Sequence, residues 1–363
     1  MATDLEVFRD TMAHKRPERV LYGASFTPDL AKRVREHLGL AEDDPEAGRK
    51  IAERYGFKRF AEPSMERPAS DPPKDYSRYW AHRELPPGTE ITSIGTALVP
   101  SGFHHFMKFV SPLEGAASLK EIEEYPLDDL SKWDFSSWPK FVTEAHARGA
   151  VTAIFTGHVY ERAWQIRGYE PFLMDLIDQP AWAECLLERL HLNSLVVAKA
   201  AARAGIDLLL TGDDVANQNA LMFSPAIWRR MILSRWAKVW RTAKEIHPAV
   251  RTWYHTDGNC MDIVGEMVDA GLDILNPVQP ECLDADEVHR RFGKRVSFDG
   301  CIGTQSTIPF GTPADVRERV RTVIDRYGRS GGLMLAPTHV LEPEVPVANI
   351  EAFADACREF GEA

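Results

Sequence analysis

From about residue 145 onward, apolar and polar positions follow one repeated pattern. Each repeat begins with a short apolar run, passes through a turn with polar residues, and continues into a stretch with the spacing of an amphipathic helix. The apolar runs are AVTAIFTGH (150–158), DLLLTGDD (207–214), VRTWYHTDG (250–258), DILNPVQP (273–280), RVSFDG (295–300) and GGLMLAPTH (331–339). Strands that alternate with helices in this way predict a parallel sheet covered by helices.

The N-terminal part supplies two further units, one clear and one ambiguous. RVLYGASF (19–26), followed by PDLAKRVREHLG, predicts a first strand and helix, and the eighth unit falls between 50 and 110. Both GFKRF (56–60) and ITSIGTALV (91–99) fit its strand. Eight units in 363 residues predict an α/β protein with one (β/α)₈ TIM barrel domain over 1–363. An open doubly wound sheet is the alternative, but no GxGxxG follows the first strand.

Residues 61–90 break the pattern. Their sequence, AEPSMERPASDPPKDYSRYWAHRELPPGTE, is rich in proline and in charged side chains. Such a stretch predicts a long surface excursion, which is either a lid or a decoration. The barrel is therefore expected to carry an N-terminal extension with this insertion.

Composition narrows the class of protein. An apolar content of 44% and a charged content of 27% are typical of a soluble globular protein. A net charge of −11 argues against a nucleic-acid partner, which calls for a basic surface. The sequence has neither a signal-peptide pattern nor a run of about 18 apolar residues, so no membrane partner is expected. Five cysteines without a CxxC pair favour the reducing cytoplasm.

Acids, imidazoles and amides recur at the ends of six successive predicted strands. The series is His158 with Glu161, Asp213 with Asp214, His255 with Asp257, Asn276 with Gln279, Asp299, and His339. In a TIM barrel the carboxyl ends of the strands surround the active site. These side chains are therefore expected to meet at one end of the barrel.

A metal site is one interpretation of this series. His255 and Asp257 stand two residues apart in TWYHTDGN, so along a strand they point to the same side. Together with His339 they make two imidazoles and one carboxylate, a set that suits Zn²⁺ with an open position, or a non-haem Fe²⁺. Alternatively, His255 only forms a hydrogen bond inside the barrel and Asp257 caps the following helix.

The remaining polar residues predict catalytic and substrate-binding groups. In GDDVANQ, Asp213 is favoured as a substrate-orienting group or general base because it comes first after the strand. Its neighbour Asp214 then faces solvent or caps a turn. Glu161 and Asp299 are further catalytic candidates, and the substrate-binding candidates are His158, Asn276, Gln279 and Arg167. His104 and His105 in GFHHF are expected on the surface or on a lid.

These segments resemble the uroporphyrinogen decarboxylase superfamily, in particular its methyltransferase-like branch, which contains corrinoid-linked methyltransferases and O-demethylase components. The stretches that carry the resemblance are YERAWQIRGYEPFLMDLIDQP, TGDDVANQNALMFSPAIW, YHTDGN, ILNPVQPE, SFDGCIGTQSTIPFGTPADV and GGLMLAPTHVLEPEVPVANIEAF. The resemblance implies a (β/α)₈ barrel, in agreement with the strand pattern. True uroporphyrinogen decarboxylases carry an arginine-rich RQAGR motif, whereas the corresponding region here is LYGASFTPDL.

The resemblance also bears on the metal. Thiol methyltransferases of the superfamily hold zinc with a His-x-Cys pair after one strand and a cysteine after the last strand. In this chain His255-x-Asp257 and His339 stand at those positions, so both cysteines are replaced by harder ligands. Such a site suits the polarisation of an ether, hydroxyl or carboxylate oxygen better than the activation of a thiol.

The resemblance implies a metal-dependent enzyme that moves a methyl group between a small methoxylated or methylated compound and a corrinoid. The chain has no DxHxxG corrinoid motif, so the corrinoid is expected on a separate partner protein. One alternative is a decarboxylase or other C–C, C–O or C–S lyase acting on a small carboxylated substrate, with arginines such as Arg167 at the site. Another is a barrel that has lost catalysis and only binds a small ligand. The sequence does not decide whether the protein is a monomer or a homodimer.

Overall fold

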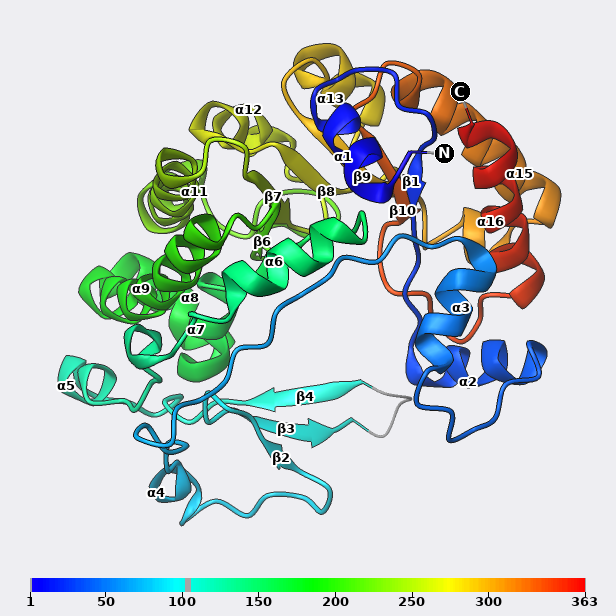
Figure 1. Ribbon diagram of the computed structural model, residues 1–363. Coiled ribbons are helices and arrows are strands. Elements are labelled where there is room, and N and C mark those ends of the chain that lie inside the picture. Colours follow the sequence, from blue (N-terminus) through cyan, green and yellow to red (C-terminus); the bar gives the residue numbers. More distant parts are fainter. Residues whose placement is uncertain (1, 102–105, 363) are drawn as a thin grey trace.

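The computed structural model describes residues 2–101 and 106–362, and its main sheet is parallel and strongly curled (Figure 1). In these residues seven strands run in the order β1-β10-β9-β8-β7-β6-β5. They are β1 (Leu21–Tyr22), β5 (Ala153–Phe155), β6 (Leu208–Gly212), β7 (Arg251–His255), β8 (Ile274–Val278), β9 (Ser297–Ile302) and β10 (Leu333–Pro337). Six of them lie within a predicted apolar run, and β9 begins inside RVSFDG (295–300) and continues two residues beyond it, which confirms the TIM-barrel type of α/β fold.

The segment 58–61 bridges the two edges of this sheet. On one side, the backbone N–H of Lys58 donates to the carbonyl of Tyr22 in β1 at 2.6 Å. On the other, the N–H of Ala61 donates to the carbonyl of Val151 at 2.8 Å, and its carbonyl accepts from the N–H of Ala153 in β5 at 3.0 Å. Of the two candidates for the second barrel strand, GFKRF (56–60) therefore takes that place.

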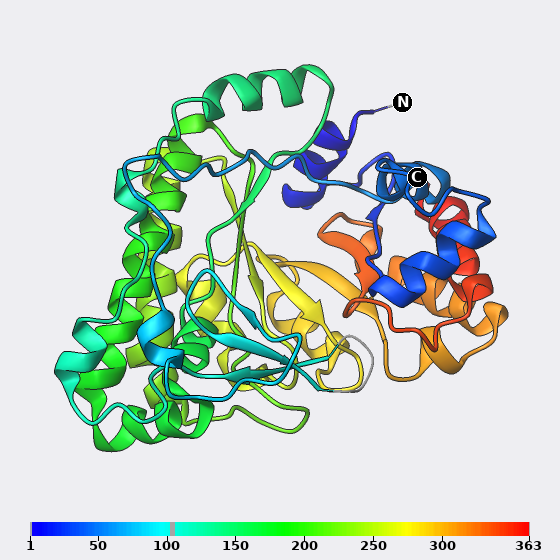
Figure 2. The same cartoon turned by 90° about the horizontal axis from the view of Figure 1, so that it is seen from below.

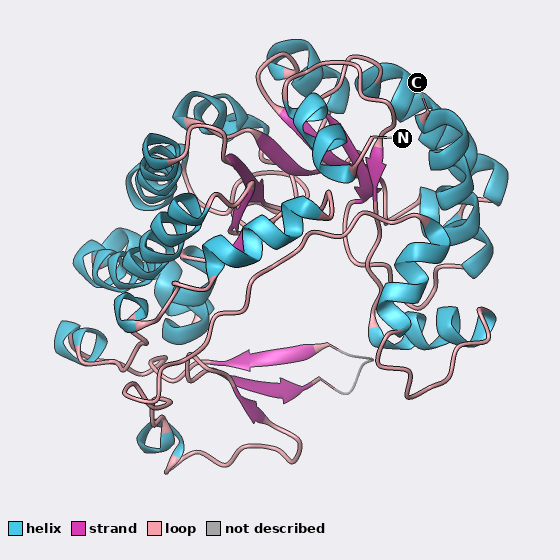
Figure 3. Ribbon diagram, viewed as in Figure 1, coloured by secondary structure: helices cyan, strands magenta, loops and turns pink. Residues whose placement is uncertain are grey.

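Helices cover the outer face of the curled sheet (Figure 3). They include α2 (Pro28–His37), α3 (Ala47–Tyr55), α6 (Trp138–Ala147), α7 (Tyr160–Arg167), α8 (Tyr169–Asp178), α9 (Pro180–Ala204), α10 (Pro225–Trp228), α11 (Ser234–Ile246), α12 (Met261–Ala270), α13 (Ala285–Phe292), α15 (Pro313–Val323) and α16 (Val347–Gly361). Their apolar sides join the core, where Trp228, Trp236 and Trp240 are fully buried. Across the described residues, no helix combines the length and the apolar character that crossing a membrane requires.

The first helix closes one end of the barrel. In α1 (Asp4–Met12) the apolar residues Leu5, Phe8 and Met12 are buried. They belong to one core cluster with Leu208 and Ile274, the first residues of β6 and β8. The amino ends of the strands are thus filled with apolar side chains, and polar chemistry is left to the carboxyl ends.

The excursion extends beyond the predicted 61–90 and forms a small sheet of its own. It contains α4 (Ser77–Trp80) and the antiparallel strands β2 (Glu90–Ile91), β3 (Ala97–Pro100) and β4 (Met107–Val110). The candidate strand 91–99 therefore belongs to this second sheet, and Figure 2 shows it, in cyan, outside the main sheet. It packs on α7, where the rings of Phe109 and Trp164 lie 5.2 Å apart.

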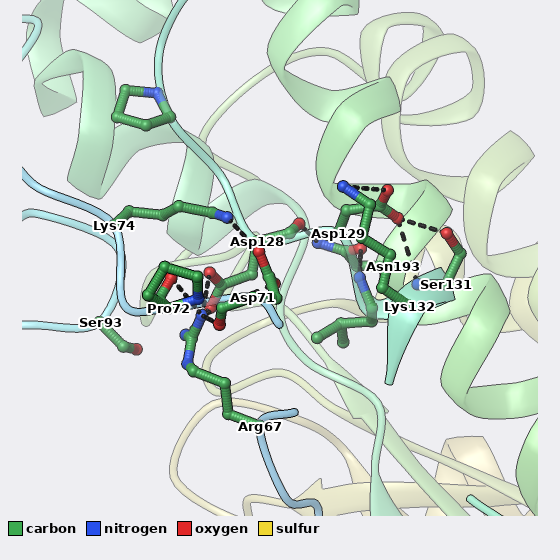
Figure 4. Close-up of polar contacts among 12 residues, drawn as sticks. Arg67, Asp71, Pro72, Lys74, Ser93, Asp128, Asp129, Ser131, Lys132 and Asn193 are labelled. Carbon is green, nitrogen blue, oxygen red and sulfur yellow. Dashed lines mark hydrogen bonds and ion pairs between the residues drawn. The ribbon is translucent and has the colours of Figure 1, made fainter. Parts of the chain in front are cut away.

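Ion pairs anchor the start of the excursion (Figure 4). The guanidinium of Arg67 donates with both terminal nitrogens to the carboxylate of Asp128, at 2.9 Å for the Nη1–Oδ1 pair. Lys74 Nζ donates to Asp71 Oδ1 at 2.6 Å. Asn193 in α9 donates through Nδ2 to the carbonyl of Asp128 at 2.8 Å. The excursion is thereby tied to the helical layer of the barrel.

Candidate metal centre at the barrel mouth

A histidine and two carboxylates meet at the barrel mouth, which we define as the carboxyl ends of β5 to β10. His255 is the last residue of β7, Asp257 lies two residues later, and Asp214 lies two residues after the end of β6. The Nε2 atom of His255 lies 3.6 Å from Asp214 Oδ1 and 4.0 Å from Asp257 Oδ2. We call these three residues the His255 cluster; each offers one ligand atom within 4.8 Å of the others.

A glycine lets the two strand ends come this close. Gly212, at the end of β6, pairs with His255 in the register of β6 and β7. A Cβ atom on Gly212 would lie 2.7 Å from both the Cβ and the carbonyl oxygen of His255. The next residue, Asp213, donates its N–H to the carbonyl of His255 at 3.0 Å. The chain then turns, so that Asp214 Oδ1 accepts the N–H of Asp257 at 2.9 Å.

Hydrogen bonds fix which nitrogen of His255 faces the carboxylates. Its Nδ1 lies 2.7 Å from Asn276 Oδ1, and the Nδ2 of Asn276 donates to the carbonyl of Asp299. With the amide oriented this way, the neutral ring carries its proton on Nδ1 and keeps the lone pair on Nε2. Burial lowers the pKa of His255, but the carboxylates of Asp214 and Asp257 outweigh it and raise that pKa above the usual value.

The donor set fits a divalent cation. Asp257 Oδ1 is buried and has no hydrogen-bond partner among the described residues. Leaving a buried carboxylate oxygen unpaired costs free energy, and a cation beside it would remove that cost. Nitrogen and oxygen ligands bind Zn²⁺ at about 2.0–2.2 Å in a tetrahedral arrangement, which separates them from one another by about 3–4 Å. The two separations from His255 Nε2, 3.6 Å to Asp214 Oδ1 and 4.0 Å to Asp257 Oδ2, lie in this range.

His339 lies at the same cavity but outside the cluster. The cavity has a volume of about 280 Å³, and its lining includes Asp257 and His339 together with the amides Asn217, Gln218, Gln279 and Gln305. The ring of His339 is exposed, with Nδ1 3.4 Å from the carbonyl of Val340. Within the described residues, two groups of ligand-type atoms lie within 4.8 Å of one another: the His255 cluster, and His158 with Glu161 and Asp213. His339 belongs to neither.

His158 and Glu161 lie beside the His255 cluster. His158 Nδ1 donates to the carbonyl of Gly212 at 2.6 Å and is 3.6 Å from Glu161 Oε1. Burial lowers the pKa of His158 to about 4, so the ring is neutral at pH 7 and Nε2 is an acceptor. Burial and the carboxylate of Asp214 raise the pKa of Glu161 to about 7. Glu161 Oε1 also accepts the N–H of Asp214 at 2.8 Å.

Asp213 has a different place from the one predicted. Its side chain is completely buried and accepts the N–H groups of Val159 and Glu161 at 2.9 and 3.0 Å, which caps the start of α7. Its other oxygen accepts Trp236 Nε1 at 2.8 Å. Both oxygens accept hydrogen bonds inside the protein, and Asp214 is the acid that joins the His255 cluster.

Comparison with known proteins identifies the family of this chain. The family model described as uroporphyrinogen decarboxylase (URO-D) matches residues 141–360, which is more than half of the chain. The chain belongs to the URO-D family. The match covers β5 to β10, and with them the whole mouth.

Individual URO-D family relatives are distant. A uroporphyrinogen decarboxylase of Methylococcus capsulatus is 25% identical over 192 residues, 52% of this chain and 51% of that protein. One of Pseudomonas fluorescens is 31% identical over 94 residues, 26% of this chain and 25% of that protein. The chain thus spans about half the length, or less, of these curated relatives. A methyltransferase from Methanosarcina mazei shares the fold over 99% of both chains, with a TM-score of 0.64 and 19% identity.

In this URO-D family protein Asp299 is paired with a lysine that the sequence did not single out. Asp299 Oδ1 lies 2.8 Å from Lys58 Nζ, and Oδ2 accepts Trp253 Nε1 at 2.9 Å. The sequence feature that could have indicated Lys58 is its position inside GFKRF (56–60), because a lysine in a candidate barrel strand needs an acidic partner. Both carboxylate oxygens of Asp299 are therefore engaged with side chains of the barrel interior.

Of the other predicted substrate-binding residues, Asn276 and Gln279 lie at the site and Arg167 lies away from the cavity. Asn276 contacts His255, and Gln279 lines the cavity while its Oε1 accepts the N–H of Gly258 at 3.1 Å. Arg167, in contrast, is buried in an ion pair with Asp175 at 2.7 Å and also donates to backbone carbonyls. Those bonds hold Arg167 inside the protein, and Arg167 is not among the residues that line the cavity. His104 and His105 lie outside the described residues.

Proposed function

We propose that this protein is a metal-dependent methyltransferase that moves a methyl group between a small methoxylated or methylated compound and a corrinoid carried by a separate protein. The His255 cluster carries the proposal, because an imidazole nitrogen and two carboxylates face one another next to a cavity of about 280 Å³. The fold shared with the Methanosarcina mazei methyltransferase over 99% of both chains supports this chemistry over others of the family.

We assign the metal to Asp214, His255 and Asp257, with His339 as a further ligand from the cavity wall. Zn²⁺ suits this set, and Fe²⁺ is the second choice. When bound, such an ion supplies Lewis acidity toward an ether or hydroxyl oxygen. This differs from a thiolate-rich site, because none of these ligands is a cysteine.

The surrounding residues would bind the substrate and move protons. Glu161 is assigned the proton transfer, because a pKa of about 7 lets a carboxyl both hold and release a proton at neutral pH. Neutral His158 supplies an acceptor at Nε2. The amide side chains of Asn217, Gln218 and Gln279 offer donors and acceptors for the oxygens of an uncharged substrate.

The charge of the cavity favours methyl transfer over a lyase reaction. A decarboxylase or other lyase commonly holds a carboxylated substrate with lysine or arginine side chains, in addition to any metal. Among the described residues, the cavity lining includes Asp257 and Glu342 but neither lysine nor arginine. The names of the two curated relatives keep decarboxylation as the second candidate. A barrel that only binds a ligand is the third.

The test starts with the metal content of the purified protein. We expect about one zinc or iron per chain, and transfer of methyl from methoxylated aromatic compounds to cob(I)alamin. His255→Ala should lose both. His37→Ala is the matched control, because His37 forms an exposed ion pair with Glu351. A metal-free protein with an intact fold would refute the metal assignment, and release of CO₂ from a carboxylated compound would favour the lyase.

A further inference from the structure

Asp299 is connected to His255 by its side chain. The carboxylate of Asp299 binds Lys58 through Oδ1 and Trp253 through Oδ2, at 2.8 and 2.9 Å. The side chains of Lys58 and Asp299 are only 11% and 8% exposed. Trp253 in turn stacks on the imidazole of His255, with ring centroids 5.7 Å apart and an interplanar angle of 15°. The two rings meet because residues two apart on β7 point to the same side.

A second connection runs through the backbone of Asp299. Its carbonyl is 3.5 Å from Asn276 Nδ2, a long hydrogen bond that is consistent with the amide oxygen of Asn276 facing His255 Nδ1. The alignment of the strands makes this contact regular, since His255 and Asn276 are partners in the register of β7 and β8. Asp299 on β9 is therefore connected to the His255 ring twice: through Trp253 to its face and through Asn276 to its Nδ1 atom.

Stability alone does not explain the buried ion pair between Lys58 and Asp299. Removing two charges from water costs several kcal/mol, and apolar residues of similar size often replace such a pair without loss. Lys58 belongs to the segment 58–61, which bridges β1 and β5. The Lys58–Asp299 pair thus couples the closure of the barrel to the orientation of Trp253.

We propose that Asp299 is a positioning residue of the candidate metal centre. Together with Lys58 it holds Trp253 and Asn276, and these two fix the ring of His255 so that Nε2 faces Asp214 and Asp257. Asp299 acts through its neighbours and not on substrate. The role of Asp299 at a metal centre rests on the proposed function. Its effect on the orientation of the His255 ring does not, and can be measured in the metal-free protein.

The deciding experiment measures the tautomer of His255 without any metal. Protein labelled with ¹⁵N-histidine is treated with a chelator, and two-bond ¹H–¹⁵N spectra are recorded at pH 8.5, with His255→Gln to assign the signal. We expect a single tautomer in the wild type, protonated at Nδ1. In Asp299→Asn the backbone carbonyl that holds Asn276 remains, but the indole N–H of Trp253 loses its carboxylate acceptor. Trp253 can then shift and take the stacked ring of His255 away from Asn276 Oδ1, so we expect a mixture of both tautomers.

The control is Asp273→Asn. Asp273 is also a partly buried, ion-paired aspartate of the barrel, with Oδ2 at 2.7 Å from Lys244 Nζ, and it accepts the N–H of Thr252 at the amino end of β7. This variant loses a comparable ion pair away from the His255 ring and should keep the wild-type tautomer. If Asp299→Asn does not fold, the double variant Lys58→Met/Asp299→Leu removes both charges at once and is expected to give the same mixture.

Zinc affinity is the second readout, measured by competition with a chromophoric chelator. We expect Asp299→Asn to bind Zn²⁺ about 10–100-fold more weakly than the wild type and Asp273→Asn to bind it equally well. An unchanged tautomer in both the single and the double variant overturns the proposal, whatever the affinity does. A wild type that binds no zinc would refute the proposed function, while the tautomer would still decide whether Asp299 positions His255.

Discussion

The Nε2 atom of His255 lies closer to Asp214 than to Asp257, at 3.6 Å against 4.0 Å, although Asp257 is its near neighbour on the chain. Asp214 thus belongs to the candidate metal centre as fully as Asp257 does. We expect Asp214→Asn to lower the affinity for Zn²⁺ at least about tenfold, because the substitution removes a charged ligand and keeps an acceptor for the N–H of Asp257. Competition with a chelator measures the affinity.

Asp269→Asn is the control for this substitution. Asp269 is an exposed aspartate that pairs with Arg295, and the change costs a surface ion pair without touching the mouth. Its Zn²⁺ affinity should equal that of the wild type. Equal affinities in Asp214→Asn and Asp269→Asn would exclude Asp214 as a ligand.

The pair Asp213 and Asp214 shows where sequence reasoning reaches its limit. The pattern correctly placed both acids directly after a strand at the barrel mouth. It favoured Asp213, but the end of a strand does not reveal which of two consecutive side chains points inward. That direction is set by α7, whose first N–H groups need an acceptor and take Asp213, and by Trp236 in α11. Both partners are distant in sequence.

A buried histidine away from the mouth should make stability depend on pH. His191 in α9 is 1% exposed, and its Nδ1 has no hydrogen-bond partner within the described part of the chain. Burial lowers its pKa from 6.5 to about 4; of the nearby charges, Glu188 opposes this shift and Lys238 and Arg235 add to it. Between these two pH values the unfolded chain binds a proton that the folded chain does not. Stability is therefore lost as the pH falls from about 6.5 to 4.

The expected loss is up to about 3 kcal/mol in the free energy of unfolding, since each pKa unit corresponds to about 1.4 kcal/mol. Urea unfolding of the wild type and of His191→Leu at pH 7, 6 and 5 measures it. As the pH falls, the free energy of unfolding of the wild type should decrease more than that of His191→Leu. His82→Leu changes an exposed histidine and should parallel the wild type. Parallel curves for His191→Leu would contradict the prediction.

The barrel itself was easier to predict than its closure. Six apolar runs after residue 145 and one at 19–26 match strands of the main sheet, because burial on both faces leaves a clear apolar signal. The closing segment 58–61 is short and contains Lys58 and Arg59, so its pattern resembles a surface turn. Lys58 is tolerated inside because Asp299, on β9, neutralises it. A contact across 241 residues leaves no local trace in a single sequence.

The close approach of β6 and β7 depends on Gly212. In Gly212→Ala the new Cβ would lie 2.7 Å from both the Cβ and the carbonyl oxygen of His255, so the end of β7 must move away. That shift weakens the bond from the N–H of Asp213 to the carbonyl of His255 and carries the imidazole away from Asp214. We expect a loss of about 1–3 kcal/mol in the free energy of unfolding, with Zn²⁺ affinity at least about tenfold lower. Gly48→Ala adds the same methyl group in α3, where nothing lies within 4 Å, and should lose neither stability nor affinity. If both variants bind Zn²⁺ as tightly as the wild type, the position of His255 relative to β6 does not govern the metal centre.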